Sequence, residues 1–248
     1  MQALILDSTP ALADNLGMAN TGCVSTESTD DYLKAILELG GPAGAPATGN
    51  ALARHLGISP ASVTGMLQRL ASRKPALIDY RKHHGARLAS EGRRRAMQVV
   101  RRHRLLELFL CEELGFPWDE VHAEAERLEH YISEKLEDRI AEKLGNPKID
   151  PHGQAIPRKT ETVAQPAAMP LDELPAGRKA AIASVSDRDP EMRRYLHAQG
   201  LIPGRTLVIV ERAPFEGSVT VRLQAGGGTR VLSLKLARAV LVQLERRD

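Results

Sequence analysis

Residues 121–130 read VHAEAERLEH, an unusual set of side chains for one helix. Glu126, Glu129 and His130 stand at i, i+3 and i+4, so a helix presents them on one face, and His122 extends this stripe one turn earlier. Carboxylates and imidazoles gathered in this way are typical ligands of a divalent metal ion. The other interpretation is a solvated acidic face, although such a face usually interleaves lysines and this stretch has none.

A second pair with ligand chemistry lies upstream, in RRHRLLE. His103 and Glu107 are spaced i, i+4, which alone is more often a surface or capping pair than a ligand set. Two antiparallel helices could bring this pair beside the first stripe and form a metal centre. The sequence has no GxSxG, no HExxH and no Gly-rich phosphate loop followed by lysine, so we do not expect an enzyme. A hydrolytic metal site or a metal-storage protein remains the rival interpretation.

Charge is distributed unevenly along the chain, which has a formal net charge of +3 over 248 residues. Residues 69–104 hold twelve Lys/Arg against two Asp/Glu, whereas residues 107–142 hold twelve Asp/Glu against three Lys/Arg. A basic block beside an acidic block indicates one part that binds a polyanion and one that collects cations. Two solvated helical faces are the alternative.

The basic block contains the pattern of a winged helix-turn-helix. ALARHLG predicts a helix that ends in a tight turn at Gly57, and Ser59 with Pro60 predicts the cap and first turn of a second helix. The strand-like runs LIDY and ARLAS flank the basic turn RKHHG, which predicts a wing. The second helix would enter the major groove of double-stranded DNA with Ser59, Pro60, Ala61, Ser62, Thr64 and Gln68. Phosphate contacts are expected from Arg54, Arg69, Arg73, Arg81, Lys82 and Arg87.

The rest of the chain predicts a mainly α fold with a small β part. Apolar periodicity predicts one helix over 91–114 and another over 119–144, and alternating apolar residues predict three or four strands near the end. In the last segment only RDPEMRRYLHAQG looks helical. The expected organisation is a flexible tail (1–24), a winged helix-turn-helix DNA-binding domain (25–95), metal-binding and dimerisation helices (96–150), a Pro-rich linker (151–170) and an SH3-like β-barrel (171–248).

Cysteine usage and hydropathy favour the cytoplasm. The two cysteines, Cys23 and Cys111, form no CxxC motif, which is typical of a reducing compartment. No apolar run approaches the ~20 residues needed to cross a membrane, and the first residues make a poor signal peptide. We therefore expect a cytoplasmic chain without a membrane partner.

These motifs, in this order, resemble the diphtheria-toxin-repressor and manganese-transport-regulator family of metal-dependent transcriptional repressors. The resemblance covers about residues 26–157 and includes STDDYLKAILEL, the helix-turn-helix and wing, RRHRLLE, VHAEAERLEH and DPHGQAIP. Residues 171–245 are similar to the SH3-like domain of the long family members, which is related to a ferrous-transport accessory domain. The resemblance implies a homodimer that represses metal-uptake genes from a palindromic operator. A metal-independent winged-helix regulator, whose acidic helix only dimerises, is the alternative.

The resemblance also implies two metal sites. The primary site falls on Asp31, Glu126, Glu129 and His130, and the ancillary site on His103, Glu107 and His122. Long members add oxygen ligands from the last domain, which align near Asp189 and Glu191.

The ligand types favour Mn²⁺. Iron-type members carry a sulfur ligand at the positions of Asp31 and Glu126, and this chain has carboxylates at both. Oxygen-rich ligation suits Mn²⁺, and Fe²⁺ remains feasible. Short manganese regulators also have a glutamate where this chain has Lys34. A cation there repels a second ion, so we expect two separate metal ions and no close binuclear pair.

Overall fold

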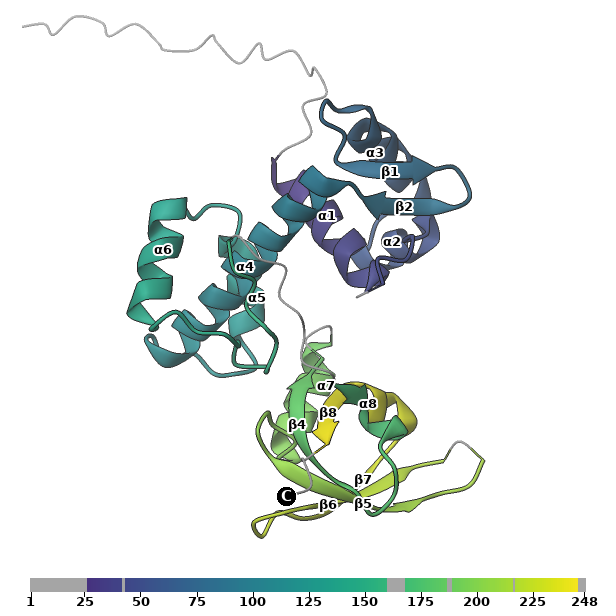
Figure 1. Cartoon of the computed structure of the whole chain (residues 1–248), viewed down its shortest axis with the longest axis vertical. Helices are drawn as coiled ribbons and strands as arrows, with labels where there is room; N and C mark the ends of the chain where they lie inside the picture. Colours follow the sequence, from purple (N-terminus) through teal and green to yellow (C-terminus); the bar gives the residue numbers. More distant parts are fainter. Residues whose placement is uncertain (1–25, 42, 160–167, 187–188, 216, 245–248) are drawn as a thin grey trace, which may run out of the picture.

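The computed structural model describes residues 26–41, 43–159, 168–186, 189–215 and 217–244. Three lobes follow one another along the chain: a winged helix, a helical lobe and a small antiparallel sheet (Figure 1). This confirms the expected fold class, while the expected tail (1–24) lies outside the described residues. Within the described part of the chain, no helix has both the length and the apolar character needed to span a membrane.

The first lobe has the predicted winged helix-turn-helix. It comprises α1 (Thr26–Gly40), α2 (Gly49–Leu56), α3 (Pro60–Ser72), β1 (Ile78–Arg81) and β2 (Gly85–Leu88). Gly57 ends α2 with φ +66°, a left-handed conformation that glycine adopts without strain, and the Ser59 side chain caps α3 by accepting from Ser62 N. The strands pair antiparallel, with Ile78 opposite Leu88.

The long helix α4 (Ser90–Glu112) joins the first lobe to the second (Figure 1). It begins directly after the wing, and Gly92 lets it approach closely because a Cβ there would lie 1.9 Å from Leu77 O. The expected domain boundary at 95/96 therefore falls inside one continuous helix.

The second lobe adds α5 (Val121–Leu128) and α6 (Glu134–Lys143) to the end of α4. The prediction of one helix over 119–144 is wrong. Ser133 interrupts it, since its side chain accepts from Leu136 N and starts a new helix, a position that serine prefers over a helix interior. The chain turns between the two helices, and this turn carries Glu129 and His130.

The beginning of the predicted linker is packed. Residues 149 and 155 form a β-bridge, and His152, Ala155 and Ile156 are buried. Residues 160–167 lie outside the described part of the chain.

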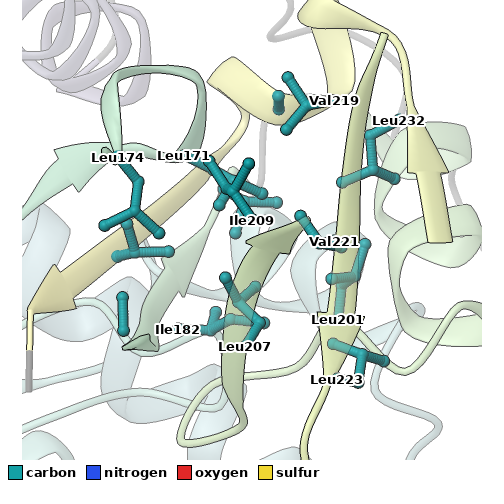
Figure 2. Close-up of a cluster of buried hydrophobic side chains, with 14 of the residues drawn as sticks. Leu171, Leu174, Ile182, Leu201, Leu207, Ile209, Val219, Val221, Leu223 and Leu232 are labelled. Carbon is teal, nitrogen blue, oxygen red and sulfur yellow. The ribbon is translucent and has the colours of Figure 1, made fainter. Parts of the chain in front are cut away.

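The third lobe is an antiparallel sheet with the neighbour order β3-β8-β4-β5-β6-β7. Its elements are β3 (Met169–Pro170), the 3-10 turn η1 (Leu171–Glu173), β4 (Lys179–Val185), α7 (Pro190–Ala198), β5 (Thr206–Arg212), β6 (Val219–Leu223), β7 (Gly228–Leu232), α8 (Leu234–Arg238) and β8 (Val240–Leu244). The described residues thus form six strands where three or four were expected, and α8 was not expected. They include no ladder between β3 and β7, so the sheet is an open version of the predicted barrel. Buried leucine, isoleucine and valine side chains fill its concave side (Figure 2).

Candidate metal centre

Potential metal ligands gather where α1, α4 and α5 meet. Among the described residues, three groups bring ligand atoms within 4.8 Å of one another. We name them the junction cluster (Asp31, Glu129, His130), the helix cluster (His103, Glu107, His122) and the loop cluster (Glu107, Asp150, His152).

The junction cluster connects the winged helix to the helical lobe. Asp31 belongs to α1, whereas Glu129 and His130 belong to the turn after α5. His130 Nε2 lies 3.0 Å from Asp31 Oδ1 and 3.5 Å from Glu129 Oε1. Behind it, His130 Nδ1 lies 3.8 Å from Asp30, which pairs with Arg95 of α4 at 2.5 Å.

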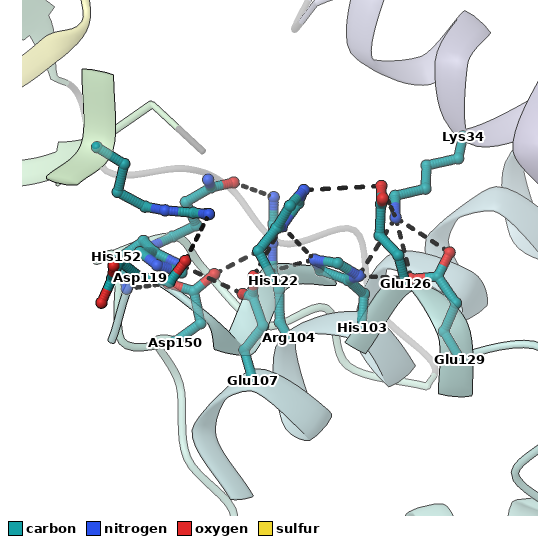
Figure 3. A network of polar contacts seen from close by, with 12 residues as sticks. Lys34, His103, Arg104, Glu107, Asp119, His122, Glu126, Glu129, Asp150 and His152 are labelled. Atoms are coloured by element: carbon teal, nitrogen blue, oxygen red, sulfur yellow. Dashed lines mark hydrogen bonds and ion pairs between the residues drawn. The ribbon is translucent and has the colours of Figure 1, made fainter. Parts of the chain in front are cut away.

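Lys34 places a positive charge between the junction and helix clusters (Figure 3). Its Nζ lies 3.0 Å from both carboxylate oxygens of Glu129 and 3.3 Å from His103 Nδ1. Burial disfavours the charged ammonium, but Glu129 and Glu126 outweigh burial and raise the pKa of Lys34. The chain thus carries its own cation among the candidate ligands.

Glu126 stands apart from the junction cluster. The sequence grouped it with Asp31, Glu129 and His130, but its side chain is 56% exposed and lies 3.8 Å from Lys34 Nζ and 3.6 Å from His122 Nε2. The predicted single face ends here because α5 ends at Leu128. The structure therefore brings together three of the four predicted primary ligands.

The helix cluster forms a triangle of ligand atoms. His103 Nε2, Glu107 Oε1 and His122 Nδ1 each lie 3.0 Å from the other two. About 3 Å is the spacing of neighbouring ligands around an octahedral ion with bonds of about 2.1 Å. The three side chains predicted for the ancillary site therefore converge on a position that suits a divalent ion.

The imidazoles of His103 and His130 are held in their charged form. Burial opposes the charge on His103, but Glu107 and Glu129 outweigh burial and raise its pKa to about 9. The neighbouring carboxylates of Asp30 and Asp31 raise the pKa of His130 to about 10. A metal ligand must be a neutral imidazole, so metal binding has to displace these protons.

The loop cluster adds two residues that the sequence analysis missed. Asp150 and His152 are buried, and His152 Nδ1 lies 3.4 Å from Glu107 Oε2. Four of its polar atoms have no hydrogen-bond partner among the described residues: Glu107 Oε2, Asp150 Oδ2 and both ring nitrogens of His152. The DPHG motif was the available signal, but it was assigned to a linker.

Asp189 and Glu191 belong to none of the three clusters. Asp189 caps α7, because its Oδ1 accepts from the amides of Glu191 and Met192 at 3.1 Å. The C-terminal lobe instead contacts the helical lobe through Arg193, which donates to Asp119 O at 3.3 Å.

The predicted DNA-contacting side chains lie at the surface. On α3 and its cap the exposed ones are Ser59, Pro60, Ala61, Ser62 and Gln68. Thr64 is half-buried, and its hydroxyl donates to Pro60 O. The predicted phosphate contacts are all exposed: Arg54, Arg69, Arg73, Arg81, Lys82 and Arg87. The surface of α3 and the wing is therefore basic and accessible.

The sequence matches three family models in succession. Residues 25–86 match the iron dependent repressor N-terminal DNA binding domain, and residues 89–158 match the iron dependent repressor metal binding and dimerisation domain. Residues 169–244 match the FeoA domain.

Full-length relatives and structures agree with these matches. The iron-dependent repressor IdeR of Mycobacterium leprae is 32% identical over 230 residues, which is 88% of this chain and 97% of the relative. A manganese-dependent transcriptional repressor in complex with manganese superposes with a TM-score of 0.81 at 38% identity and covers 88% of this chain and 100% of its own. The structure of ScaR with bound Zn²⁺ has a TM-score of 0.75 at 30% identity, and the match covers 87% of this chain and 98% of the ScaR chain.

Proposed function

Because the chain belongs to the family of iron-dependent transcriptional repressors, we propose that its DNA binding is switched by Mn²⁺. The family assignment makes it a metal-dependent DNA-binding regulator. The identity of the ion, the ligands and the operator are the parts that we propose.

The junction cluster is the observation that carries this proposal. Asp31 comes from the lobe that holds α3 and the wing, whereas Glu129 and His130 come from the helical lobe. A bound divalent ion supplies the charge that lets Asp31 and Glu129 face one site. The ligands then tie α1 to the turn after α5. Because α1 and α3 share the buried core of the first lobe, α1 in turn fixes the orientation of α3. Metal binding and DNA binding are thereby coupled by a free energy.

Mn²⁺ is favoured over Fe²⁺ by the donor atoms. The ligands of the junction cluster are two carboxylates and one imidazole, and the neighbouring Glu126 offers another carboxylate. Hard oxygen donors suit Mn²⁺, and no sulfur ligand competes in these clusters. The similar repressor in complex with manganese supports Mn²⁺, and the relative named as iron-dependent keeps Fe²⁺ as the alternative.

A homodimer is the second part of the proposal. Leu128, Tyr131 and Leu136 expose 40%, 74% and 48% of their surface on α5, α6 and the turn between them. Apolar side chains gathered on one surface are typical of an interface. A two-fold dimer would hold two copies of α3 about 34 Å apart, which matches a palindromic operator. Light scattering at micromolar concentration with Mn²⁺ should give twice the chain mass, and a monomer would contradict the dimer.

The remaining expectations follow from the same role. The relatives are repressors, so we propose that the junction and helix clusters bind metal without turnover and that the chain works in the cytoplasm, where its DNA is. The two competing interpretations, a metalloenzyme and a metal-independent regulator, make different predictions in one experiment.

That experiment is a fluorescence-anisotropy titration of labelled promoter DNA with and without Mn²⁺, Fe²⁺ or Zn²⁺. We expect metal to tighten specific binding about 5–150-fold, the usual range of allosteric coupling. DNA affinity that is the same in chelator and in Mn²⁺ would overturn the proposal, and hydrolysis of a phosphoester or peptide would favour the enzyme.

A further inference from the structure

The loop cluster links Glu107, a ligand in the proposed function, to the C-terminal lobe. We propose that His152 is a positioning residue for Glu107, and that the C-terminal lobe controls metal binding at the helix cluster by holding His152 in place. On this inference, which rests on the proposed function, the lobe acts on the site through His152, and none of the lobe's described residues belongs to the helix cluster.

The two oxygens of Glu107 face in different directions. Oε1 lies 3.0 Å from His103 Nε2 and from His122 Nδ1, so it faces the helix cluster. Oε2 lies 3.4 Å from His152 Nδ1 on the other side. The Glu107 side chain is buried, so water does not orient it. His152 is therefore the neighbour that constrains the second oxygen, while His103 and His122 contact the first (Figure 3).

His152 is itself fixed by contacts along its backbone. Its amide donates to Asp150 Oδ1 at 2.8 Å, and Asp150 Oδ1 also accepts from Gln154 N at 2.8 Å. Its carbonyl accepts from Val185 N, at the end of β4 in the C-terminal lobe, at 3.1 Å. An outer residue that is fixed in this way can hold a metal ligand in one orientation.

Trp118 completes the link between the two lobes. Its ring packs edge-on against His152 with centroids 4.6 Å apart, and it stacks on His197 of α7 at 5.0 Å. Its Nε1 donates to Pro151 O at 2.9 Å. The loop that carries His152 is therefore packed between Trp118 and the sheet of the C-terminal lobe.

A third metal ion in the loop cluster is a weaker explanation of its unpaired atoms. Arg104 Nε lies 3.6 Å from Asp150 Oδ2, and the buried guanidinium of Arg193 acts on His152 as a second positive charge. Two arginines already offset the two carboxylates, so a divalent ion there would add uncompensated charge in a buried place. A positioning role needs no added charge.

Trp118 is the single tryptophan of the chain, so its fluorescence reports on this link directly. We would titrate the full-length protein with Mn²⁺ and follow Trp118 emission beside calorimetric binding, with His152→Phe and His152→Gln as variants. Phenylalanine keeps an aromatic ring against Trp118 but places no polar nitrogen beside Glu107 Oε2, whereas glutamine keeps an N–H that can face it. We expect Mn²⁺ binding at the helix cluster to weaken about 10–100-fold in His152→Phe, the usual effect of losing an outer partner, and less in His152→Gln.

The control is His197→Phe, which changes the other face of Trp118 without touching Glu107. It should leave Mn²⁺ affinity unchanged, and all three variants should keep the metal-free emission of an ordered Trp118. Unchanged Mn²⁺ affinity in His152→Phe would overturn the inference. Equal loss in His152→Phe and His152→Gln with red-shifted metal-free emission would also overturn it, because the lobe would simply have separated. In either case Mn²⁺-dependent DNA binding through the junction cluster should persist, and only its absence from the wild type would count against the proposed function.

Discussion

The helical lobe has two junctions, and they are built from different chemistry. Toward the winged helix it offers charges: Asp31 with His130, Lys34 with Glu129, and Asp30 with Arg95. A groove of about 790 Å³ opens along this charged junction. Toward the C-terminal lobe the contacts are packing and backbone bonds: Trp118 against His197, His152 O with Val185 N, and Asp119 O with the buried Arg193 of that lobe.

The difference indicates which junction a cation can switch. A buried ion pair contributes little net free energy because desolvation offsets the attraction of its charges, and beside a groove it can exchange one cation for another. Close packing and backbone hydrogen bonds respond weakly to an added ion, and their loss costs several kcal/mol. We infer that the charged junction is the switch and that the packed junction is a fixed support.

The largest expected effect comes from breaking the packed junction with Gly153→Ala. Gly153 has φ +82°, and a Cβ there would lie 2.0 Å from Ala183 O in β4. Steric overpacking and left-handed strain together should destabilise the protein by about 2–5 kcal/mol and turn Trp118 toward water. Thermal unfolding and Trp118 emission would measure this effect.

Gly177→Ala is the matched control for this change. Gly177 has φ +73° in the loop just before β4, but a Cβ added there would meet no atom of the described residues within 4 Å beyond its own chain neighbours. It therefore carries the backbone strain without the clash and should destabilise by about 1–2 kcal/mol only. Equal destabilisation by the two substitutions would show that the packed junction is not rigid.

The next effect comes from removing the ligand that crosses the charged junction. Asp31→Ala should leave the helix cluster able to bind Mn²⁺ but abolish most of the metal dependence of DNA binding, a loss of about 5–150-fold in coupling. Anisotropy and calorimetry on the same samples would separate the two quantities. Glu142→Ala, which removes an exposed carboxylate of α6, should change neither. If Asp31→Ala still responds fully to Mn²⁺, the switch lies elsewhere.

Lys34 gives a test in the opposite direction. Its ammonium donates to both carboxylate oxygens of Glu129, so a metal ion must compete with Lys34 for these oxygens. Lys34→Met should tighten Mn²⁺ binding at the junction cluster about tenfold, which corresponds to about 1.4 kcal/mol. The metal-free protein should at the same time lose stability, because the buried carboxylate of Glu129 loses one of its partners.

Calorimetric titration with Mn²⁺ would measure the affinity, and melting curves in chelator would measure the stability. Lys135→Met, on the exposed face of α6, is the control and should leave both unchanged. Weaker Mn²⁺ binding in Lys34→Met would mean that Lys34 supports the site, and that the charged junction does not work by exchange of cations.

The metal-free charged junction should also respond to pH. The pKa of His130 is raised to about 10 from an ordinary value of 6.5, because the carboxylates of Asp30 and Asp31 favour its charged form. The folded state then holds a proton that the unfolded state has lost, so this contribution to stability is complete below pH 6.5 and disappears as pH rises through 10. Melting temperature in chelator should therefore fall over this range, and Mn²⁺ affinity should rise.

His130→Gln removes the titrating group at this position. The substitution should lower stability near pH 6.5 and reduce the slope between pH 6.5 and 10. A slope equal to that of the wild type would assign the pH dependence to other groups, such as His103, whose pKa is raised to about 9.

Local patterns explain why the sequence predicted some parts and missed others. The winged helix was predictable because Gly57, Ser59 and Pro60 end one helix and begin the next through local contacts, with partners only a few residues away. In the helix cluster, His103 and Glu107 could be paired from the sequence because they share a face of one helix, and the family resemblance joined His122 to them. Residues 150–152 were missed because their burial depends on β4 and Trp118, which are distant in sequence. The break before α6 was missed because Ser133 was not read as a cap.

The smallest expected effect concerns Glu126, which lies at the edge of the charged junction. Because this side chain is 56% exposed and lies 3.8 Å from Lys34, we expect it to join the ligands only after Lys34 gives way. Glu126→Cys should raise the activation of DNA binding by Fe²⁺, Co²⁺ or Zn²⁺ relative to Mn²⁺ by a few-fold. Thiolate is the softer donor, and Mn²⁺ stands at the weak end of the divalent series. DNA anisotropy with each metal would measure the order, beside Glu124→Cys, which places the same thiol on the same helix where Glu124 pairs with Arg127 instead. An unchanged metal order in Glu126→Cys, or the same shift in Glu124→Cys, would leave Asp31, Glu129 and His130 as the whole protein contribution to the switch.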